Sequence, residues 1–228
     1  MEQQQLADNI TKVQTRIRHS CEKYGRKPGD VTLLAVSKTH TAKTLRLGAE
    51  LGLTQFGENY LSEALEKIDA LADIRPLCWH FIGPVQSNKT RAIATHFDWV
   101  HSVDRLKIAL RLNDQRPPEL APLQICLQVN ISGEASKSGV EPARLAQLAA
   151  AVSELPRLQL RGLMAIPEAG TNWQQQRTAF AHLRKALQTL PIPALDTLSM
   201  GMSGDLEAAI AEGATIVRIG TDIFGARR

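Results

Sequence analysis

The chain has 228 residues, of which 43% are hydrophobic and 22% are charged. These fractions are typical of a folded globular protein and exclude a chain that is disordered throughout. The 27 lysines and arginines exceed the 23 acidic residues by four, but they are scattered along the chain, and only 4% of the residues are aromatic. A nucleic-acid site needs a concentrated basic face, so we expect no nucleic-acid partner.

The sequence also argues against export, membrane insertion and metal binding. No apolar run approaches the roughly 18 residues that a membrane helix needs, and the polar opening MEQQQLADNI has no signal-peptide core. The cysteines Cys21, Cys78 and Cys126 are far apart and odd in number, which fits neither a disulfide framework nor a zinc site. We therefore predict a cytoplasmic protein without a resident metal.

Segments with helical and strand-like patterns alternate along the chain. Residues 1–26 carry apolar side chains at helical spacing, which predicts an opening amphipathic helix. Three further apolar stripes predict helices around residues 61–71, 145–155 and 180–190. Short apolar runs predict eight strands, at residues 31–36, 55–57, 78–83, 98–103, 123–131, 158–166, 197–200 and 216–220.

This alternation predicts the fold. Strands that alternate with helices form parallel βαβ units, and eight such units predict an α/β fold of the TIM-barrel type, a (β/α)8 barrel. The alternative is a doubly wound open sheet, but no GxGxxG motif follows the first strand. We predict one domain over residues 1–228 and a monomer, with an extra opening helix that covers the bottom of the barrel or contacts another chain.

In such barrels the functional groups lie where strands end and loops begin. The loops after the last two predicted strands supply small residues and hydroxyl groups, namely Ser203, Gly220 and Thr221. Backbone N–H groups of such loops, with a helix that opens near Ser203, attract an anion, so we expect a phosphate group here. The competing interpretation is that these residues only form tight turns.

Lys38 follows the first strand after one intervening residue, which predicts an amine at the mouth of the barrel. A partly desolvated lysine is more often neutral and therefore nucleophilic toward a carbonyl carbon. The alternative is a solvated loop lysine. A phosphate pocket and a nucleophilic lysine together indicate a phosphorylated carbonyl compound, and both pyridoxal phosphate and a sugar phosphate qualify.

Arg218 lies inside the last strand, and both orientations of its side chain are open at this point. If it points inward, the buried guanidinium needs a partner or a ligand atom. It is then suited to donate a hydrogen bond to a pyridine nitrogen, which holds the ring unprotonated and makes it a weak electron sink. If it points outward, a surface salt bridge is expected.

Three other polar residues are weaker candidates. Glu58 and Asn59 follow the second strand and can line the pocket, although Asn59 is also suited to cap the next helix. His80 lies in an apolar strand and is interpreted as a core residue rather than a ligand. The histidines show no HExxH spacing, which agrees with the absence of a predicted metal site.

The strand ends carry seven characteristic segments in this order: AVSKTH, FGENY, WHFIGPVQSNK, VNISGEASKSG, LRGLMAIPE, LSMGMSGDLEAAI and VRIGTDIFGAR. Together they resemble the pyridoxal phosphate homeostasis family, from about residue 30 to the end of the sequence. The resemblance implies a fold type III barrel that binds pyridoxal 5′-phosphate (PLP). Such a barrel is related to the alanine racemase N-terminal domain and lacks the additional C-terminal β domain of the racemases.

The resemblance also implies a role for each candidate residue. Lys38 corresponds to the lysine that forms the internal aldimine, and Arg218 to the arginine that faces the pyridine nitrogen. The remaining cofactor-binding positions correspond to Asn59, Ser203, Gly220 and Thr221. The chain departs from the family pattern at residues 39–41 and at Gly204, which alters the pocket rim and a helix start but leaves the assignment of Lys38 intact.

The function implied by the resemblance is to hold PLP as a lysine aldimine and to buffer it or deliver it to PLP-dependent apoenzymes. This serves vitamin B6 and amino- and keto-acid homeostasis, without robust catalytic turnover. Lys137 is a candidate second amine for cofactor transfer, and a solvated loop lysine is the alternative.

Two other functions compete with that of a cofactor carrier. An amino-acid racemase needs an acid or base on each face of the substrate carbon, and the only tyrosines available are Tyr24 and Tyr60. A Schiff-base aldolase that acts on a sugar phosphate is the third hypothesis, since it needs the lysine and the phosphate loops but no bound chromophore.

Overall fold

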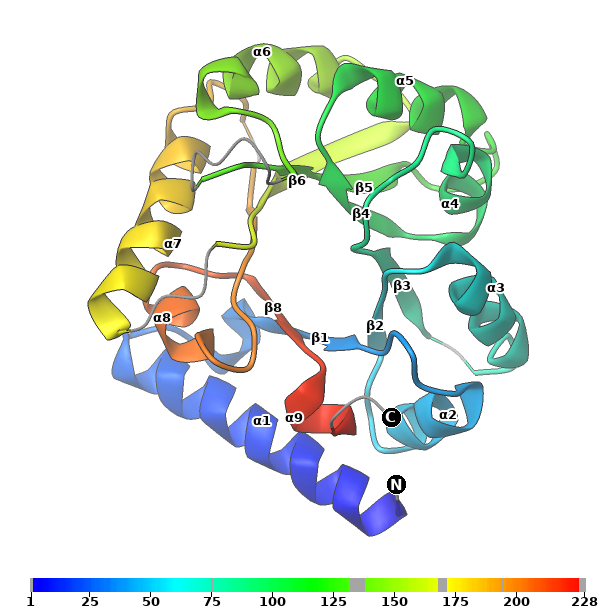
Figure 1. Ribbon diagram of the computed structural model, residues 1–228, viewed down its shortest axis with the longest axis vertical. Coiled ribbons are helices and arrows are strands. Elements are labelled where there is room, and N and C mark those ends of the chain that lie inside the picture. The colour runs from blue at the N-terminus through cyan, green and yellow to red at the C-terminus, as the bar shows by residue number, and fades with distance from the viewer. Residues whose placement is uncertain (1, 75, 132–137, 168–171, 194, 226–228) are drawn as a thin grey trace.

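The computed structural model describes residues 2–74, 76–131, 138–167, 172–193 and 195–225. Eight parallel strands pair in chain order and close between the first and the last, which confirms the predicted barrel (Figure 1). The strands are β1 Thr32–Val36, β2 Gln55–Glu58, β3 Cys78–Phe81, β4 Trp99–Val103, β5 Leu123–Gln128, β6 Leu158–Met164, β7 Thr197–Ser199 and β8 Ile216–Ile219.

The predicted apolar runs all contain a strand, but most of the strands are shorter than their run. The strand β3, for example, ends at Phe81, before Ile82 and Gly83. The loops after β2 and β3 pass so close to each other that a Cβ atom on Gly83 would lie 2.3 Å from the backbone oxygen of Asn59. The apolar residues beyond the strand ends line a cavity instead, as Ile82 does.

Helices surround the barrel on its outer side (Figure 1). The apolar stripes of residues 1–26, 61–71, 145–155 and 180–190 correspond to four of these helices, which confirms those predictions. The helices are α1 Gln3–Lys23, α2 Ala42–Glu50, α3 Leu61–Ala70, α4 Thr90–His96, α5 Leu106–Gln115, α6 Pro142–Ser153, α7 Trp173–Gln188, α8 Leu206–Ala211 and α9 Thr221–Phe224, with a 3-10 turn at Pro28–Asp30.

The opening helix α1 lies beside the barrel and not beneath it (Figure 1). It packs against α8, α9 and α2 through a buried stripe that includes Leu6, Ile10, Val13 and Ile17. The reason is that α9, the helix after β8, has only four residues, which is too short to cover the outer side of β8 and β1. The helix α1 takes that place in the outer ring, so the expected position below the barrel is wrong.

The core has an apolar outer layer and a partly polar interior. Between strands and helices, rings such as those of Phe56 and Trp79 pack with their centroids 5.6 Å apart, and burying a large apolar side chain stabilises a fold by about 1.5–3 kcal/mol. Inside the barrel, His80, His101 and Arg218 are buried polar groups. None of the helices in the described ranges is both long and apolar enough to cross a bilayer.

Candidate functional site

A cavity of about 250 Å³ opens at the carboxyl ends of the strands. All six predicted site residues line it, although they come from four separate segments of the chain: Lys38, Asn59, Ser203, Arg218, Gly220 and Thr221. Their neighbours in the wall include the apolar side chains of Val36, Ile82 and Ile166. The structure therefore brings together the residues that the sequence placed at strand ends, while the role of each remains a prediction.

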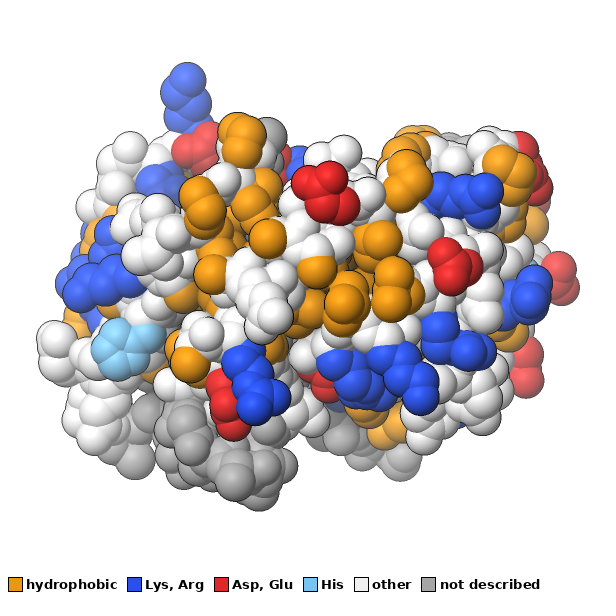
Figure 2. Space-filling model, turned by 90° about the horizontal axis from the view of Figure 1, so that it is seen from above, with side chains coloured by type: hydrophobic (Ala, Val, Ile, Leu, Met, Phe, Trp, Pro, Cys, Tyr) orange, Lys and Arg blue, Asp and Glu red, His pale blue; other side chains and the backbone are white. Residues whose placement is uncertain are grey.

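A larger groove of about 460 Å³ lies between α5 and α6, on the face that Figure 2 shows. Its lining includes the apolar residues Leu106, Leu148 and Ala151 and the basic residues Arg105 and Arg144. It contains none of the predicted site residues. We assign the functional site to the smaller cavity, because a candidate nucleophile and two loops suited to an anion converge there.

The turn after β1 presents Lys38 to the cavity. Successive residues of a strand point to opposite faces, so that Val36 and Lys38 line the cavity while Ser37 points to the outer side of the barrel. His40 N donates to Ser37 O at 3.1 Å and closes the turn. Thr39 has a φ of 67°, a conformation that a β-branched residue rarely adopts.

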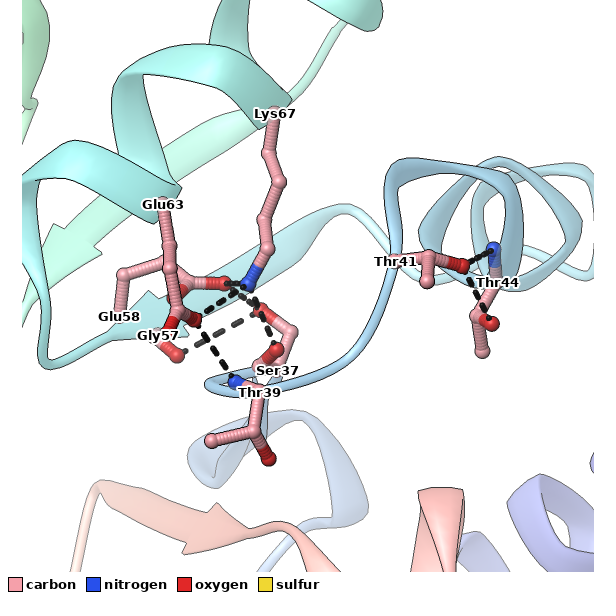
Figure 3. A network of polar contacts seen from close by, with 8 residues as sticks. All are labelled: Ser37, Thr39, Thr41, Thr44, Gly57, Glu58, Glu63 and Lys67. Carbon is pink, nitrogen blue, oxygen red and sulfur yellow. Dashed lines mark hydrogen bonds and ion pairs between the residues drawn. The ribbon is translucent and has the colours of Figure 1, made fainter. Parts of the chain in front are cut away.

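Glu58 does not line the cavity, so that expectation is wrong. Its carboxylate lies on the outer side of the barrel wall, because the neighbouring Asn59 takes the inward position. Glu58 Oε1 accepts hydrogen bonds from Ser37 Oγ at 2.6 Å and from Lys67 Nζ at 2.8 Å (Figure 3). Burial raises the pKa of Glu58, and the bonds from Lys67 and Ser37 oppose that rise.

Asn59 lines the cavity and does not cap a helix. The N-cap position of α3 is Tyr60, and its side chain makes no capping hydrogen bond. The side-chain oxygen of Asn59 is buried and has no hydrogen-bond partner among the described residues. A buried acceptor without a donor costs free energy, so Asn59 Oδ1 is suited to a hydroxyl or N–H group of a ligand.

Arg218 points into the barrel, which settles the question that the sequence left open. Its Nη1 donates to the Ser199 carbonyl at 2.6 Å and to Ser199 Oγ at 2.8 Å, and Nη2 donates to the Ala165 carbonyl at 2.9 Å. Burial lowers the pKa of Arg218 to about 10, and the charge of Asp205 acts in the opposite direction. The guanidinium is therefore still a cation at neutral pH.

A chain of hydrogen bonds continues from Arg218 across the barrel interior. Because Ser199 Oγ accepts a hydrogen bond from Arg218, its hydroxyl donates to His101 Nδ1, and the oxygen and nitrogen are 2.8 Å apart. His101 then donates from Nε2 to His80 Nδ1 at 2.9 Å, and His80 donates from Nε2 to Gln55 Oε1 at 2.7 Å. These tautomers follow from the order of donors and acceptors, and they require both rings to be neutral.

The environment of the two rings favours that neutral form. Burial lowers the pKa of His80 to about 3. Burial also lowers the pKa of His101 well below its usual value, and the neighbouring His80 and Arg218 add to this effect. His80 is thus a hydrogen-bonded core residue, as predicted. The role of His101 was missed, although its inward position on β4 follows from strand alternation.

The loops after β7 and β8 form the end of the cavity that was predicted to hold phosphate. Gly220 lies tightly against β1, since a Cβ atom there would lie 3.1 Å from the Val36 carbonyl oxygen. The helix α9 begins directly after it, and the first N–H groups of a helix have no acceptor within the helix. Asp205 Oδ1 accepts from Met202 N at 2.6 Å and braces the other loop, although α8 begins only at Leu206.

Arg16 joins these two loops from the outside, and no motif in the sequence predicts this contact. Its Nη2 donates to the Ser203 carbonyl at 2.9 Å, and its Nη1 lies 2.5 Å from Asp222 Oδ2. Asn9, also on α1, donates to the Ile223 carbonyl at 2.9 Å. The opening helix therefore holds together the segments that contain Ser203 and Thr221. Lys137 lies outside the described residues.

Residues 3–228 match the family model of the alanine racemase N-terminal domain. The pyridoxal phosphate homeostasis protein of Pseudomonas aeruginosa is 63% identical over 222 residues, which cover 97% of this chain and 96% of that protein. The chain belongs to the pyridoxal phosphate homeostasis family. The member of this family from Escherichia coli K12 is 52% identical over 231 residues, with 97% of both chains covered.

A solved structure agrees with this family assignment. PipY of Synechococcus elongatus PCC7942 with PLP bound has a TM-score of 0.83 and 36% identity to this chain. The match covers 96% of this chain and 100% of PipY. The resemblance that the strand-end segments indicated is thereby confirmed, and so is the barrel related to the alanine racemase N-terminal domain.

Proposed function

We propose that this chain binds PLP covalently at Lys38, and that it buffers the cofactor or delivers it to PLP-dependent apoenzymes. The observation that carries the proposal is the convergence of Lys38, Arg218 and both anion-suited loops on one cavity of about 250 Å³. The unpartnered oxygen of Asn59 fits the same ligand, which has polar substituents on its ring. The names of the relatives and the PLP bound to PipY support it further.

Lys38 supplies the nucleophile. PLP would supply an aldehyde carbon as the electrophile, and the Lys38 amine would condense with it, with release of one molecule of water. Attack requires the neutral form of the amine. Because the step is reversible, water restores the free amine and releases the aldehyde.

The loops after β7 and β8 bind the phosphate. Ser203 and Thr221 offer hydroxyl donors, and Gly220 lets the backbone approach the anion closely. Charged side chains are not required for such a site, since backbone N–H groups at loops and helix starts bind phosphate directly. Anchoring at this end positions the aldehyde near Lys38 and adds non-covalent affinity.

Arg218 limits the chemistry that follows. When bound, PLP supplies an electron-withdrawing ring, and that ring is a strong electron sink only while its nitrogen is protonated. The guanidinium is fixed by three hydrogen bonds to Ser199 and Ala165 and stays a cation. As a donor it would hold the ring nitrogen of bound PLP unprotonated, which fits a carrier better than an enzyme that forms carbanions.

The positions of the tyrosines also favour a carrier over a racemase. Tyr24 OH donates to Glu207 Oε1 at 3.0 Å and its ring stacks on Trp173, on the outer side of the molecule. Tyr60 is 52% exposed. Neither belongs to the described lining of the cavity, so neither supplies the second base that racemisation needs.

Delivery to apoenzymes, the monomeric state and the cytoplasmic location belong to the same proposal. The mild positive charge of +4 is compatible with a diffusing carrier of an anionic cofactor. A carrier in this sense needs an accessible cavity, and Thr221 at its rim is exposed.

The visible absorption spectrum of the purified protein tests the proposal. We expect a yellow absorption band after incubation with PLP. Borohydride should abolish this band and leave the reduced pyridoxyl group covalently attached to the peptide that contains Lys38. The variant Lys38→Ala should stay colourless, and Lys43→Ala, on the exposed side of α2, should behave as the unmodified chain. A colourless unmodified chain would contradict the proposal and return attention to a sugar phosphate. Formation of D-amino acids from L-amino acids by the loaded protein would favour the racemase.

A further inference from the structure

The ion pair of Glu58 and Lys67 lies just outside the barrel wall behind Lys38. Its atoms Oε1 and Nζ are 2.8 Å apart, and the two side chains are only 0% and 6% exposed. Withdrawing two charges from water is costly, and apolar replacements of such pairs are often as stable as the pair itself. Stability alone therefore does not account for these two residues.

Both charged groups hold Ser37, the residue before Lys38. Lys67 Nζ donates to the Ser37 carbonyl at 2.9 Å, and Ser37 Oγ donates to Glu58 Oε1 at 2.6 Å (Figure 3). Ser37 N donates to the Gly57 carbonyl at 3.0 Å. The main chain and the side chain of Ser37 are thus both fixed, from α3 on one side and from β2 on the other.

A third charged group holds Thr39, the residue after Lys38. Glu63 Oε2 accepts from Thr39 N at 2.9 Å and lies 3.6 Å from Lys67 Nζ (Figure 3). Thr39 is the one non-glycine residue with positive φ in the described part of the chain. Such a conformation persists where the surroundings over-determine it, and the bond from Glu63 is part of those surroundings.

We propose that Glu58 and Lys67 are positioning residues that fix the turn Ser37–Lys38–Thr39 so that the Lys38 amine faces the aldehyde carbon. This inference rests on the proposed function, because it assigns a role in covalent attachment at Lys38. In the proposed function the loops after β7 and β8 hold the phosphate, and their residues Ser203, Gly220 and Thr221 line the same cavity as Lys38. The phosphate loops would then set the place where the aldehyde meets the amine. A looser turn therefore weakens the covalent step and leaves phosphate binding unchanged.

The test uses the double variant Glu58→Leu/Lys67→Met, which removes both charges and keeps apolar volume in the outer layer. Two ligands separate the effects: PLP, and pyridoxine 5′-phosphate, which has the same ring and phosphate but no aldehyde. The measurements are the equilibrium and rate of appearance of the visible band with PLP, and calorimetric affinity for pyridoxine 5′-phosphate. Lys43→Met serves as the matched control for loss of an exposed lysine.

We expect covalent attachment of PLP to the double variant to be about tenfold to a hundredfold slower and weaker, since small misplacements of a nucleophile have effects of this size. Affinity for pyridoxine 5′-phosphate should stay within about twofold. An unchanged reaction with PLP would overturn the inference. Equal losses for both ligands would overturn it as well, because they would indicate a general effect on the fold.

A second variant tests the same inference if the double variant folds poorly. Glu63→Gln alters a side chain that is 39% exposed, leaves the buried pair of Glu58 and Lys67 in place, and weakens the acceptor of Thr39 N. We expect a smaller selective loss with PLP, of about threefold, and equal behaviour of Glu63→Gln and the unmodified chain with PLP would contradict the role of the turn. Failure of the unmodified chain to form the visible band would be a failure of the proposed function instead.

Discussion

The two ends of the cavity are each supported by an ion pair, but one pair is buried and the other is exposed. Behind Lys38 stands the pair Glu58–Lys67, with side chains 0% and 6% exposed. Behind the loops suited to phosphate stands the pair Arg16–Asp222, with side chains 46% and 32% exposed. Each pair links elements that are distant in the chain, since α3 reaches the turn after β1, and α1 reaches the loops after β7 and β8.

The difference in burial separates what the two pairs contribute. A buried charge that loses its partner destabilises a fold strongly, whereas an exposed pair is screened by water and contributes little. The Lys38 end of the cavity is therefore supported by a buried ion pair, while the loops after β7 and β8 are linked by an exposed one. This arrangement agrees with the proposed function, in which a bond forms at the first end and the ligand enters and leaves past the second.

The largest effect is expected from breaking the buried pair on one side. In Lys67→Ala, the carboxylate of Glu58 stays buried without its partner, and the free energy of unfolding should fall by about 3–5 kcal/mol. Urea denaturation measures this change. Lys43→Ala is the control, with an expected change below about 0.5 kcal/mol. If the free energy of unfolding of Lys67→Ala falls by less than about 1 kcal/mol, the buried pair contributes no more to stability than an exposed pair does.

The buried histidines His80 and His101 show what burial alone contributes, because they form no ion pair among the described residues. The pKa of His80 is about 3 in the folded protein, below the usual 6.5, so the unfolded chain binds more protons between these values. Stability should therefore fall as pH decreases below 6.5, by about 1.4 kcal/mol per pH unit for each buried histidine. His101 contributes in the same direction, since its pKa is also lowered.

Urea denaturation between pH 7 and pH 5 measures this slope. The variant His80→Gln keeps a polar group in the chain of hydrogen bonds and should show a shallower slope. His96→Gln replaces an exposed histidine and is the control for the loss of a histidine as such. An equal slope in all three proteins would mean that acid destabilises the fold elsewhere.

The smallest effect is expected at the exposed pair. Arg16→Ala should change the free energy of unfolding by about 0.5 kcal/mol or less. It should weaken binding of pyridoxine 5′-phosphate about threefold, since the loops of Ser203 and Thr221 lose their outer link. Calorimetry at low and at high salt measures the loss of affinity and shows how far salt screens the contribution of the Arg16–Asp222 ion pair. The control is Arg18→Ala, on the exposed face of α1. A loss of affinity above about tenfold in Arg16→Ala would contradict the expectation that the exposed pair has the smaller effect.

The fold was predictable from the sequence because buried parallel strands appear as short apolar runs. Lys38, Gly220 and Thr221 could be predicted to lie together because parallel strands bring their carboxyl ends to one edge of the barrel, and all three line one cavity. The pairing of Lys67 with Ser37 was not found, since 30 residues separate them and nothing local marks one helical lysine among others. Arg16 was missed for the same reason, at a separation of 187 residues from Ser203.

The orientation of side chains was predictable in part. Glu58 was placed in the pocket with Asn59, although neighbouring strand residues point to opposite faces. Applying that alternation at Asn59 would have put Glu58 outside the barrel wall, near α3. For Arg218 the same alternation gives the inward direction once Gly220 is placed at the cavity, two residues farther along.

The position of α1 has a consequence for synthesis on the ribosome. This helix is made early, but its partners α8 and α9 are made last, and Asn9 bonds to Ile223 across 214 residues. Contacts of such long sequence separation form late, because the intervening chain must first be ordered. A nascent chain from which β8 and α9 have not yet emerged contains Lys38 but cannot use Gly220 and Thr221, which line the same cavity. The cavity is therefore incomplete until these last elements are released.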